Sequence, residues 1–170
     1  MRRLAAALVA ALGLALGEAR ADPPEIVEAL PGAERVGEAR FTYLVWPVFD
    51  AELFTRSGAF DWSEAFALSL TYRRGFSADA LTGQTIEEMR ARGVSAQVLA
   101  GLRPRLRACF ADVSAGDRFT AVSLTDERAS LFFNGAYRCT LNAPGLRQAF
   151  FGIWLDGRSN ATFSARLRGA

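Results

Sequence analysis

The sequence contains no lysine and no histidine, so all 20 of its basic residues are arginines. Histidine is the usual general base and a common metal ligand, and lysine forms Schiff bases, so mechanisms built on either residue are excluded. The sequence also lacks a glycine-rich phosphate loop between a strand and a helix. We therefore expect no cofactor and no metal site.

Disorder is also excluded by the composition. Of the 170 residues, 51% are hydrophobic and 22% are charged, which suits a packed core. A chain of this length fits one domain rather than two independent cores.

The N-terminus has the pattern of a secretory signal. Arg2 and Arg3 precede an apolar run over residues 4–16, and small residues follow at Ala19 and Ala21. A membrane-spanning helix needs about twenty apolar residues, so the run is too short for an anchor. The pattern predicts a signal peptide over residues 1–21.

The mature chain is then one domain over residues 22–170, periplasmic or secreted, with no membrane span. The leader carries three arginines and one glutamate, so the mature chain has equal numbers of arginines and acidic residues. Because no positive excess remains to neutralise phosphates, we expect no nucleic-acid partner.

Hydrophobic periodicity predicts antiparallel strands interrupted by one block of helices and followed by a second, which is an α+β organisation. The stretch 40–46 is apolar on both faces and predicts a strand covered on both sides. An N-cap at Ser77 or Asp79 predicts a helix through Arg92, and Ser95 with 3.6-residue periodicity predicts a second helix over 95–110. After Pro47, residues 48–55 are expected as a second strand or as the first one continued past a bulge. The remaining strands are expected over 67–73, 118–124, 129–133 and 136–141, and the last helices from residue 144 and over 159–167.

The two cysteines are both expected to point inward. Cys109 falls on the apolar stripe of the second helix, and Cys139 shares a strand face with Tyr137 and Leu141. In an oxidising compartment they can form a disulfide. The alternative is two small buried thiols.

Arg40 is the one residue whose position suggests binding chemistry, because it begins an otherwise apolar strand. A guanidinium at the rim of an apolar cleft can hold a carboxylate or phenolate through two parallel hydrogen bonds. The alternative is an exposed charge at a strand end.

Five segments follow one another along the mature chain. They are VGEARFTYLVWPVFDAELF from Val36, ALSLTYRRGF from Ala67, GDRFT from Gly116, LFFNG from Leu131 and FFGIWLDG from Phe150. In this order they resemble the bacterial, exported branch of the chalcone isomerase-like proteins. This resemblance implies an open-faced β-sandwich, in which helices pack on one face of a large antiparallel sheet and leave a cleft between the layers.

Plant members of this family either cyclise chalcones to flavanones or bind fatty acids without catalysis. The resemblance aligns Arg40 with the arginine that holds the substrate phenolate, and Thr42 follows it closely. The enzymes carry a tyrosine and an asparagine on and before the helix that follows the Tyr72 strand, but residues 77–92 contain neither.

The resemblance therefore favours non-catalytic binding of a small apolar or amphipathic, fatty-acid-like molecule in the cleft. Arg40 would hold its anionic end, with Thr42 and Tyr43 as neighbouring contacts. One alternative is an intramolecular lyase or isomerase acting on a phenolic or enone substrate, with Arg40 as the electrophilic group and Thr42 or Tyr43 assisting. The other is a structural or partner-binding protein without a ligand.

Overall fold

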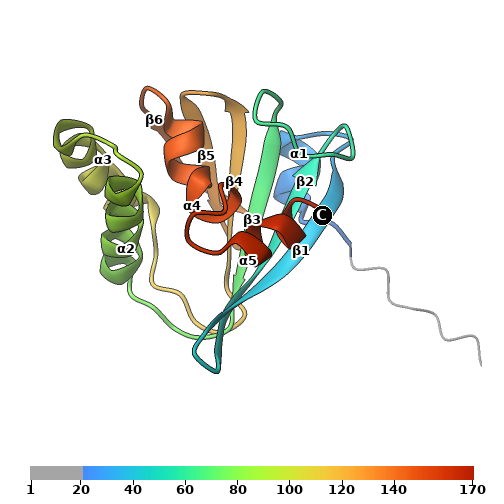
Figure 1. Cartoon of the computed structure of the whole chain (residues 1–170), viewed down its shortest axis with the longest axis horizontal. Helices are drawn as coiled ribbons and strands as arrows, with labels where there is room; N and C mark the ends of the chain where they lie inside the picture. The colour runs from blue at the N-terminus through green and yellow to red at the C-terminus, as the bar shows by residue number, and fades with distance from the viewer. Residues whose placement is uncertain (1–20) are drawn as a thin grey trace, which may run out of the picture.

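The fold is built on a single six-stranded antiparallel sheet, seen in a computed structural model that describes residues 21–170. The predicted signal peptide lies outside the described residues except for its last residue, Ala21. The strands follow one another in space in the same order as in the chain (Figure 1). They are β1 (Glu34–Tyr43), β2 (Trp46–Thr55), β3 (Phe66–Tyr72), β4 (Arg118–Thr125), β5 (Arg128–Phe133) and β6 (Ala136–Asn142).

Helices occupy three places in the chain. They are α1 (Pro24–Ala29), the pair α2 (Ala78–Ala91) and α3 (Ala96–Cys109), and the C-terminal group η1 (Arg147–Phe151, π-helical), α4 (Gly152–Leu155) and α5 (Ala161–Leu167). The hydroxyls of Ser77 and Ser95 accept hydrogen bonds from the first turns of α2 and α3, so the serines start these helices as predicted.

Alternation along the strands divides the apolar residues between the two faces of the sheet. On β3, Phe66, Leu68 and Leu70 join the main core beneath α2 to α5. Ala67 points the other way, into a smaller cluster in which α1 packs through Ile26. The α+β architecture is therefore the predicted open sheet with helices on one face, and α1 covers part of the second face.

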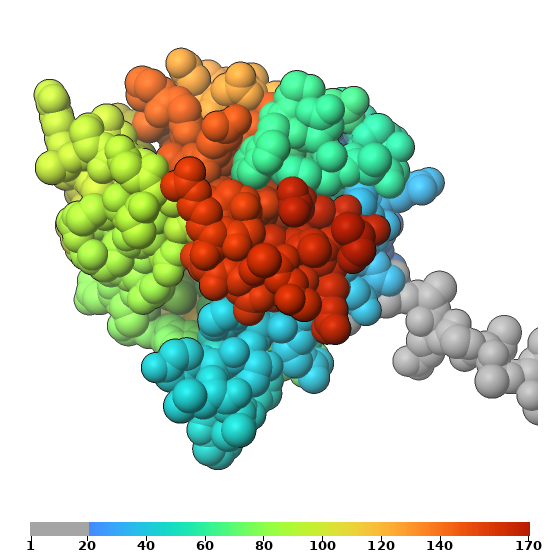
Figure 2. All heavy atoms as spheres, in the orientation of Figure 1, coloured from blue at the N-terminus to red at the C-terminus, as the bar shows by residue number. Residues whose placement is uncertain are grey.

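One predicted strand is wrong. Residues 40–46 do not form a covered strand, because β1 ends at Tyr43 and β2 begins at Trp46 after a two-residue turn at Leu44 and Val45. Leu44 has φ 56°, a conformation that leucine rarely adopts. Without glycine or asparagine in the turn, the sequence carried no hairpin signal. The exposed tip extends beyond the rest of the molecule (Figure 2).

Contacts at both ends attach the α2–α3 pair to the rest of the fold. Cys109 at the end of α3 forms a disulfide with Cys139 on β6, and their Cα atoms are 5.6 Å apart. At the other end of the pair, Arg92 follows α2 and reaches the C-terminal helices. None of the helices within residues 21–170 is long and apolar enough to cross a membrane.

Candidate ligand cavity

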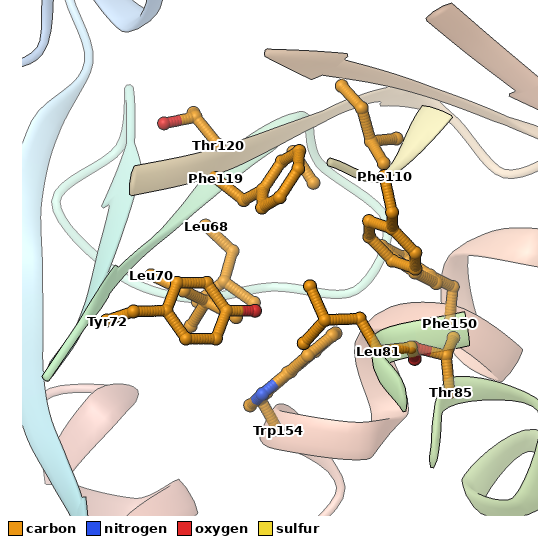
Figure 3. Close-up of a pocket in the computed structure, with 12 residues that line it drawn as sticks. Leu68, Leu70, Tyr72, Leu81, Thr85, Phe110, Phe119, Thr120, Phe150 and Trp154 are labelled. Carbon is orange, nitrogen blue, oxygen red and sulfur yellow. The ribbon is translucent and has the colours of Figure 1, made fainter. Parts of the chain in front are cut away.

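A small apolar cavity lies between the sheet and the helical layer, with a volume of about 40 Å³. Figure 3 shows how side chains from both layers converge on it. All of the lining residues are uncharged. They are Leu68, Leu70 and Tyr72 from β3, Phe119, Thr120 and Ala121 from β4, Leu131 from β5, Leu81 and Thr85 from α2, Phe110, and Phe150 and Trp154 from the C-terminal helices.

Strand alternation explains the floor of the cavity. Leu68, Leu70 and Tyr72 are two residues apart on β3, so their side chains point to the same face. Phe119 lies across the β3–β4 pair from Leu70 and continues this floor. The roof comes from helices, because Leu81 and Thr85 are four residues apart and share one face of α2.

Tyr72 supplies the most distinctive polar group in the cavity. Its side chain is buried, and its hydroxyl points into the space between Leu81 and Trp154 (Figure 3). Burial raises the pKa of the Tyr72 phenol, so this group stays protonated at physiological pH. Among residues 21–170, no group is hydrogen-bonded to the Tyr72 hydroxyl. It can therefore donate a hydrogen bond to a ligand.

Thr85 supplies a second polar atom on the opposite wall. Its hydroxyl donates a hydrogen bond of 2.8 Å to the Leu81 carbonyl, one turn earlier on α2. The O–H of Thr85 is therefore already engaged, and its oxygen can only accept a hydrogen bond from another partner. The cavity can thus accept an apolar body and hydrogen-bond one polar group near Tyr72.

The size of the cavity limits what can enter it. A volume of about 40 Å³ holds only a few water molecules, since each needs roughly 10–15 Å³ by the same kind of measure. An acyl chain therefore fits only if the helical layer moves away from the sheet.

Arg92 links α2 to the C-terminal helices at the outer end of the helical layer. Its side chain, only 6% exposed, forms ion pairs with Glu88 on α2 and with Asp156 just after α4, at 2.7 and 2.9 Å. It also donates hydrogen bonds to the Gly152 carbonyl and the Ser159 hydroxyl. Because a buried guanidinium needs these partners, movement of α2 away from α4 must replace them with water.

The residues predicted to hold the ligand lie elsewhere. Arg40, Thr42 and Tyr43 are all exposed and do not line the cavity. The Arg40 guanidinium is instead 2.6 Å from Asp50 on the neighbouring strand. The structure therefore offers no ligand-anchoring role for Arg40 inside the cavity, and the predicted strand end is part of the exposed hairpin.

Asp50 joins two arginines at the base of this hairpin. It accepts hydrogen bonds from Arg40 and from Arg73, whose Nε is 2.7 Å from the carboxylate. Partial burial raises the pKa of Asp50, but the two guanidinium groups outweigh that effect and hold the pKa below its usual value. The carboxylate stays ionised, and the cluster carries net positive charge.

The sequence pattern did not identify the cavity residues as a site. Leu68, Leu70 and Tyr72 alternate as an ordinary core-facing strand does, and Phe150 and Trp154 repeat as an ordinary buried helix face does. A cavity wall and a filled core have the same apolar pattern. The one available signal was a tyrosine on the inward face, because its hydroxyl needs a polar partner.

An open antiparallel sheet, helices over one face and an apolar cavity between the layers define the chalcone isomerase-like fold. Among solved structures, the chain is similar to a crystal structure of an Arabidopsis thaliana fatty-acid binding protein. The TM-score is 0.64 and the sequence identity 7%, over 82% of this chain and 88% of that chain. No family model and no curated protein matches the sequence. The likeness establishes the fold.

Proposed function

We propose that this protein binds a small apolar or amphipathic molecule, of the fatty-acid type, between its sheet and its helices without transforming it. The observation that carries the proposal is the uncharged cavity with the Tyr72 hydroxyl directed into it. Binding would then rest on apolar contact, with one hydrogen bond to orient the polar end of the ligand. The ligand named for the Arabidopsis neighbour supports this class of molecule.

We further propose that the protein acts after export, in the periplasm or outside the cell. The disulfide between Cys109 and Cys139 supports this location, because such bonds persist in oxidising compartments. The proposal also places the chain in the exported branch of the family that it resembles.

Binding is tested with protein that has been delipidated and then titrated with dodecanoic acid, followed by native mass spectrometry and intrinsic fluorescence. Trp154 lines the cavity, so its emission should change when the ligand enters. Replacing Ala121 with Val adds two methyl groups to the cavity wall and should weaken binding about tenfold, with little loss of stability. Unchanged affinity in Ala121→Val would contradict the proposed site.

Tyr72→Phe tests the hydrogen bond separately from the volume. We expect it to weaken binding of dodecanoic acid about threefold to tenfold and to leave binding of dodecane unchanged. Tyr137→Phe is the matched control, because Tyr137 is exposed on β6 and its hydroxyl contacts Thr140. Equal effects of the two tyrosine variants would argue against a ligand at Tyr72.

Opening of the helical layer is tested at Arg92. Arg92→Gln removes the ion pairs to Glu88 and Asp156, so dodecanoic acid should associate and dissociate faster than in the wild type. Stopped-flow fluorescence measures both rates. Unchanged rates would show that the ligand enters by another route.

Incubation with a chalcone, followed by absorbance, tests the isomerase alternative, which predicts turnover.

A further inference from the structure

The most exposed apolar feature of the described chain is the tip of the β1–β2 hairpin. Tyr43, Leu44, Val45 and Trp46 are consecutive, and each is between 61% and 81% exposed. The whole stretch 41–49 contains no charged residue. Exposing four large apolar side chains at one place is costly in water, so the tip is expected to contact something apolar.

The backbone of the tip indicates selection for these side chains rather than for the turn. Tyr43 pairs with Trp46, so only Leu44 and Val45 form the loop. The positive φ of Leu44 at the first loop position is typical of a type II′ turn, which favours glycine there. Keeping leucine in this conformation costs stability, and such strain is concentrated at functional sites.

The arginines at the base of the hairpin set the charge beside the apolar tip. Arg40 and Arg73 both pair with the carboxylate of Asp50, and the exposed Arg74 follows Arg73 directly in the chain. These four residues form a collar with a net charge of plus two at neutral pH. Arg40 is four residues from Leu44, or about 13 Å at the usual rise of a strand. An apolar end with a basic collar at this spacing matches the acyl boundary and phosphate layer of a bilayer.

Neither of the two hollows described within residues 21–170 matches the tip. The cavity beneath the helices is too small, at about 40 Å³. A larger surface hollow of about 460 Å³ is partly lined by the charged side chains of Arg92, Asp156 and Arg158. A second copy is therefore a poor receptor for a protruding apolar tip, whereas a fluid bilayer needs no preformed socket.

We propose that the β1–β2 hairpin inserts its tip into the surface of a membrane that contains anionic lipids. Trp46 and Tyr43 then lie at the interface, where amphipathic aromatic rings are favoured. Leu44 and Val45 reach the acyl boundary, and the arginine collar meets the lipid phosphates. This inference goes beyond the proposed ligand binding and does not depend on the cavity.

The test is flotation of the mature protein with phosphatidylcholine vesicles, with and without phosphatidylglycerol. We expect binding to the mixed vesicles, weaker binding to phosphatidylcholine alone, and a blue shift of emission that Trp46→Phe removes. Failure to float with either vesicle would overturn the proposal.

The decisive variant is Leu44→Gly with Val45→Ser, because glycine suits the first position of this turn. We expect about tenfold weaker vesicle binding, while the thermal unfolding temperature stays the same or rises. Leu124→Ser removes an exposed leucine at the end of β4 and is the matched control. It should float like the wild type.

Two other outcomes would also overturn the proposal. Equal loss of binding in both variants would indicate a general effect of surface hydrophobicity. Concentration-dependent dimers in sedimentation, abolished by the double variant, together with no vesicle binding, would indicate a second copy as the occupant. Tyr72→Phe should float normally, so failure of the cavity proposal and failure of the membrane proposal are distinguishable.

Discussion

At the scale of single residues, Glu25 is a buried charge whose partners come from distant parts of the chain. Its carboxylate oxygens each lie 3.0 Å from a guanidinium nitrogen of Arg118 on β4, and one also accepts a hydrogen bond from Thr120 at 2.6 Å. Burial raises the pKa of Glu25, but these donors outweigh it and hold the pKa below the usual 4.5. The ionised form therefore fastens α1 to the sheet.

This pKa shift fixes how Glu25 contributes to stability at different pH. Because the folded-state pKa is depressed, the contribution is fully present above about pH 4.5 and is lost as the pH falls through the folded value. Glu25→Gln should lower the free energy of unfolding by about 2 kcal/mol at neutral pH, and the difference from wild type should shrink in acid. Urea denaturation at several pH values measures this.

Asp61→Asn serves as the comparison for Glu25. Asp61 is exposed, and its carboxylate accepts hydrogen bonds from Ser63 within its own turn. Its substitution should change the pH profile less than Glu25→Gln does. A profile that is identical for wild type and Glu25→Gln would contradict the assigned role.

The sequence predicted the position of a residue correctly where contacts between near neighbours in the chain determine it. The prediction failed where the position depends on tertiary structure. The strands expected over 129–133 and 136–141 leave only Asn134 and Gly135 between them, a residue pair that favours a tight hairpin turn, and the structure has this hairpin. Arg40 was expected at the rim of a cleft, but its place depends on a turn that the sequence did not mark. For Tyr72 the sequence predicted that the side chain points inward. It did not predict the cavity that the hydroxyl enters.

At the scale of elements, α5 is seated against β1 through a glycine. A Cβ on Gly37 would lie 2.6 Å from the Leu167 carbonyl oxygen and 2.8 Å from the Gly169 nitrogen. Only a residue without a side chain permits β1 to approach the end of α5 this closely. Since backbone atoms fill the space, a larger residue forces the helix away.

Gly37→Ala should therefore destabilise the protein by about 2 kcal/mol, through overpacking between β1 and α5. Urea denaturation measures the loss of stability. Faster limited proteolysis at the C-terminus would show that the destabilisation is at α5. Gly101→Ala is the matched control, because Gly101 lies in α3 with open space around its Cα. That variant should gain up to about 1 kcal/mol from higher helix propensity. Equal effects of the two would refute the close-approach argument.

Element prediction followed the strength of the local signals. Ser77, one of the two N-caps expected for α2, and Ser95 for α3 are the caps in the structure, because a side-chain oxygen at an N-cap satisfies a backbone amide in any context. The β1–β2 hairpin was missed because Leu44 adopts its backbone conformation against its own preference. Strain of this kind is visible only once the neighbouring strands are paired.

At the scale of the whole molecule, the disulfide restrains the unfolded chain as well as the folded one. Cys109 and Cys139 are 30 residues apart, and the loop between them contains β4 and β5. Closing a loop of this length contributes on the order of 3 kcal/mol by the chain-entropy argument. Reduction should lower the free energy of unfolding by about that amount.

The measurement is urea denaturation with and without reductant, compared with Cys109→Ala combined with Cys139→Ala. The double variant should match the reduced wild type and should not respond to reductant. A reductant effect that persists in the double variant would show that it has another cause.

The overall architecture was predictable, but its cavity was not. The order of strands and helices, and the face on which Leu68 and Leu70 lie, follow from residue spacing and from the resemblance to a known family. The cavity depends on how far α2 stands from β3, which is set by contacts such as those of Arg92 with Asp156. Spacing along a sequence does not encode the distance between layers.

Because each strand of the sheet lies beside its predecessor in the chain, the sheet can assemble stepwise from the N-terminal end. The β1–β2–β3 meander can pair before α2 and α3 have been synthesised, and it exposes the edge of β3 until β4 arrives. During that interval the β3 edge is the place where two incomplete chains can join. The length of the α2–α3 insertion therefore sets how long the unpaired β3 edge of a nascent chain can pair with another chain and aggregate.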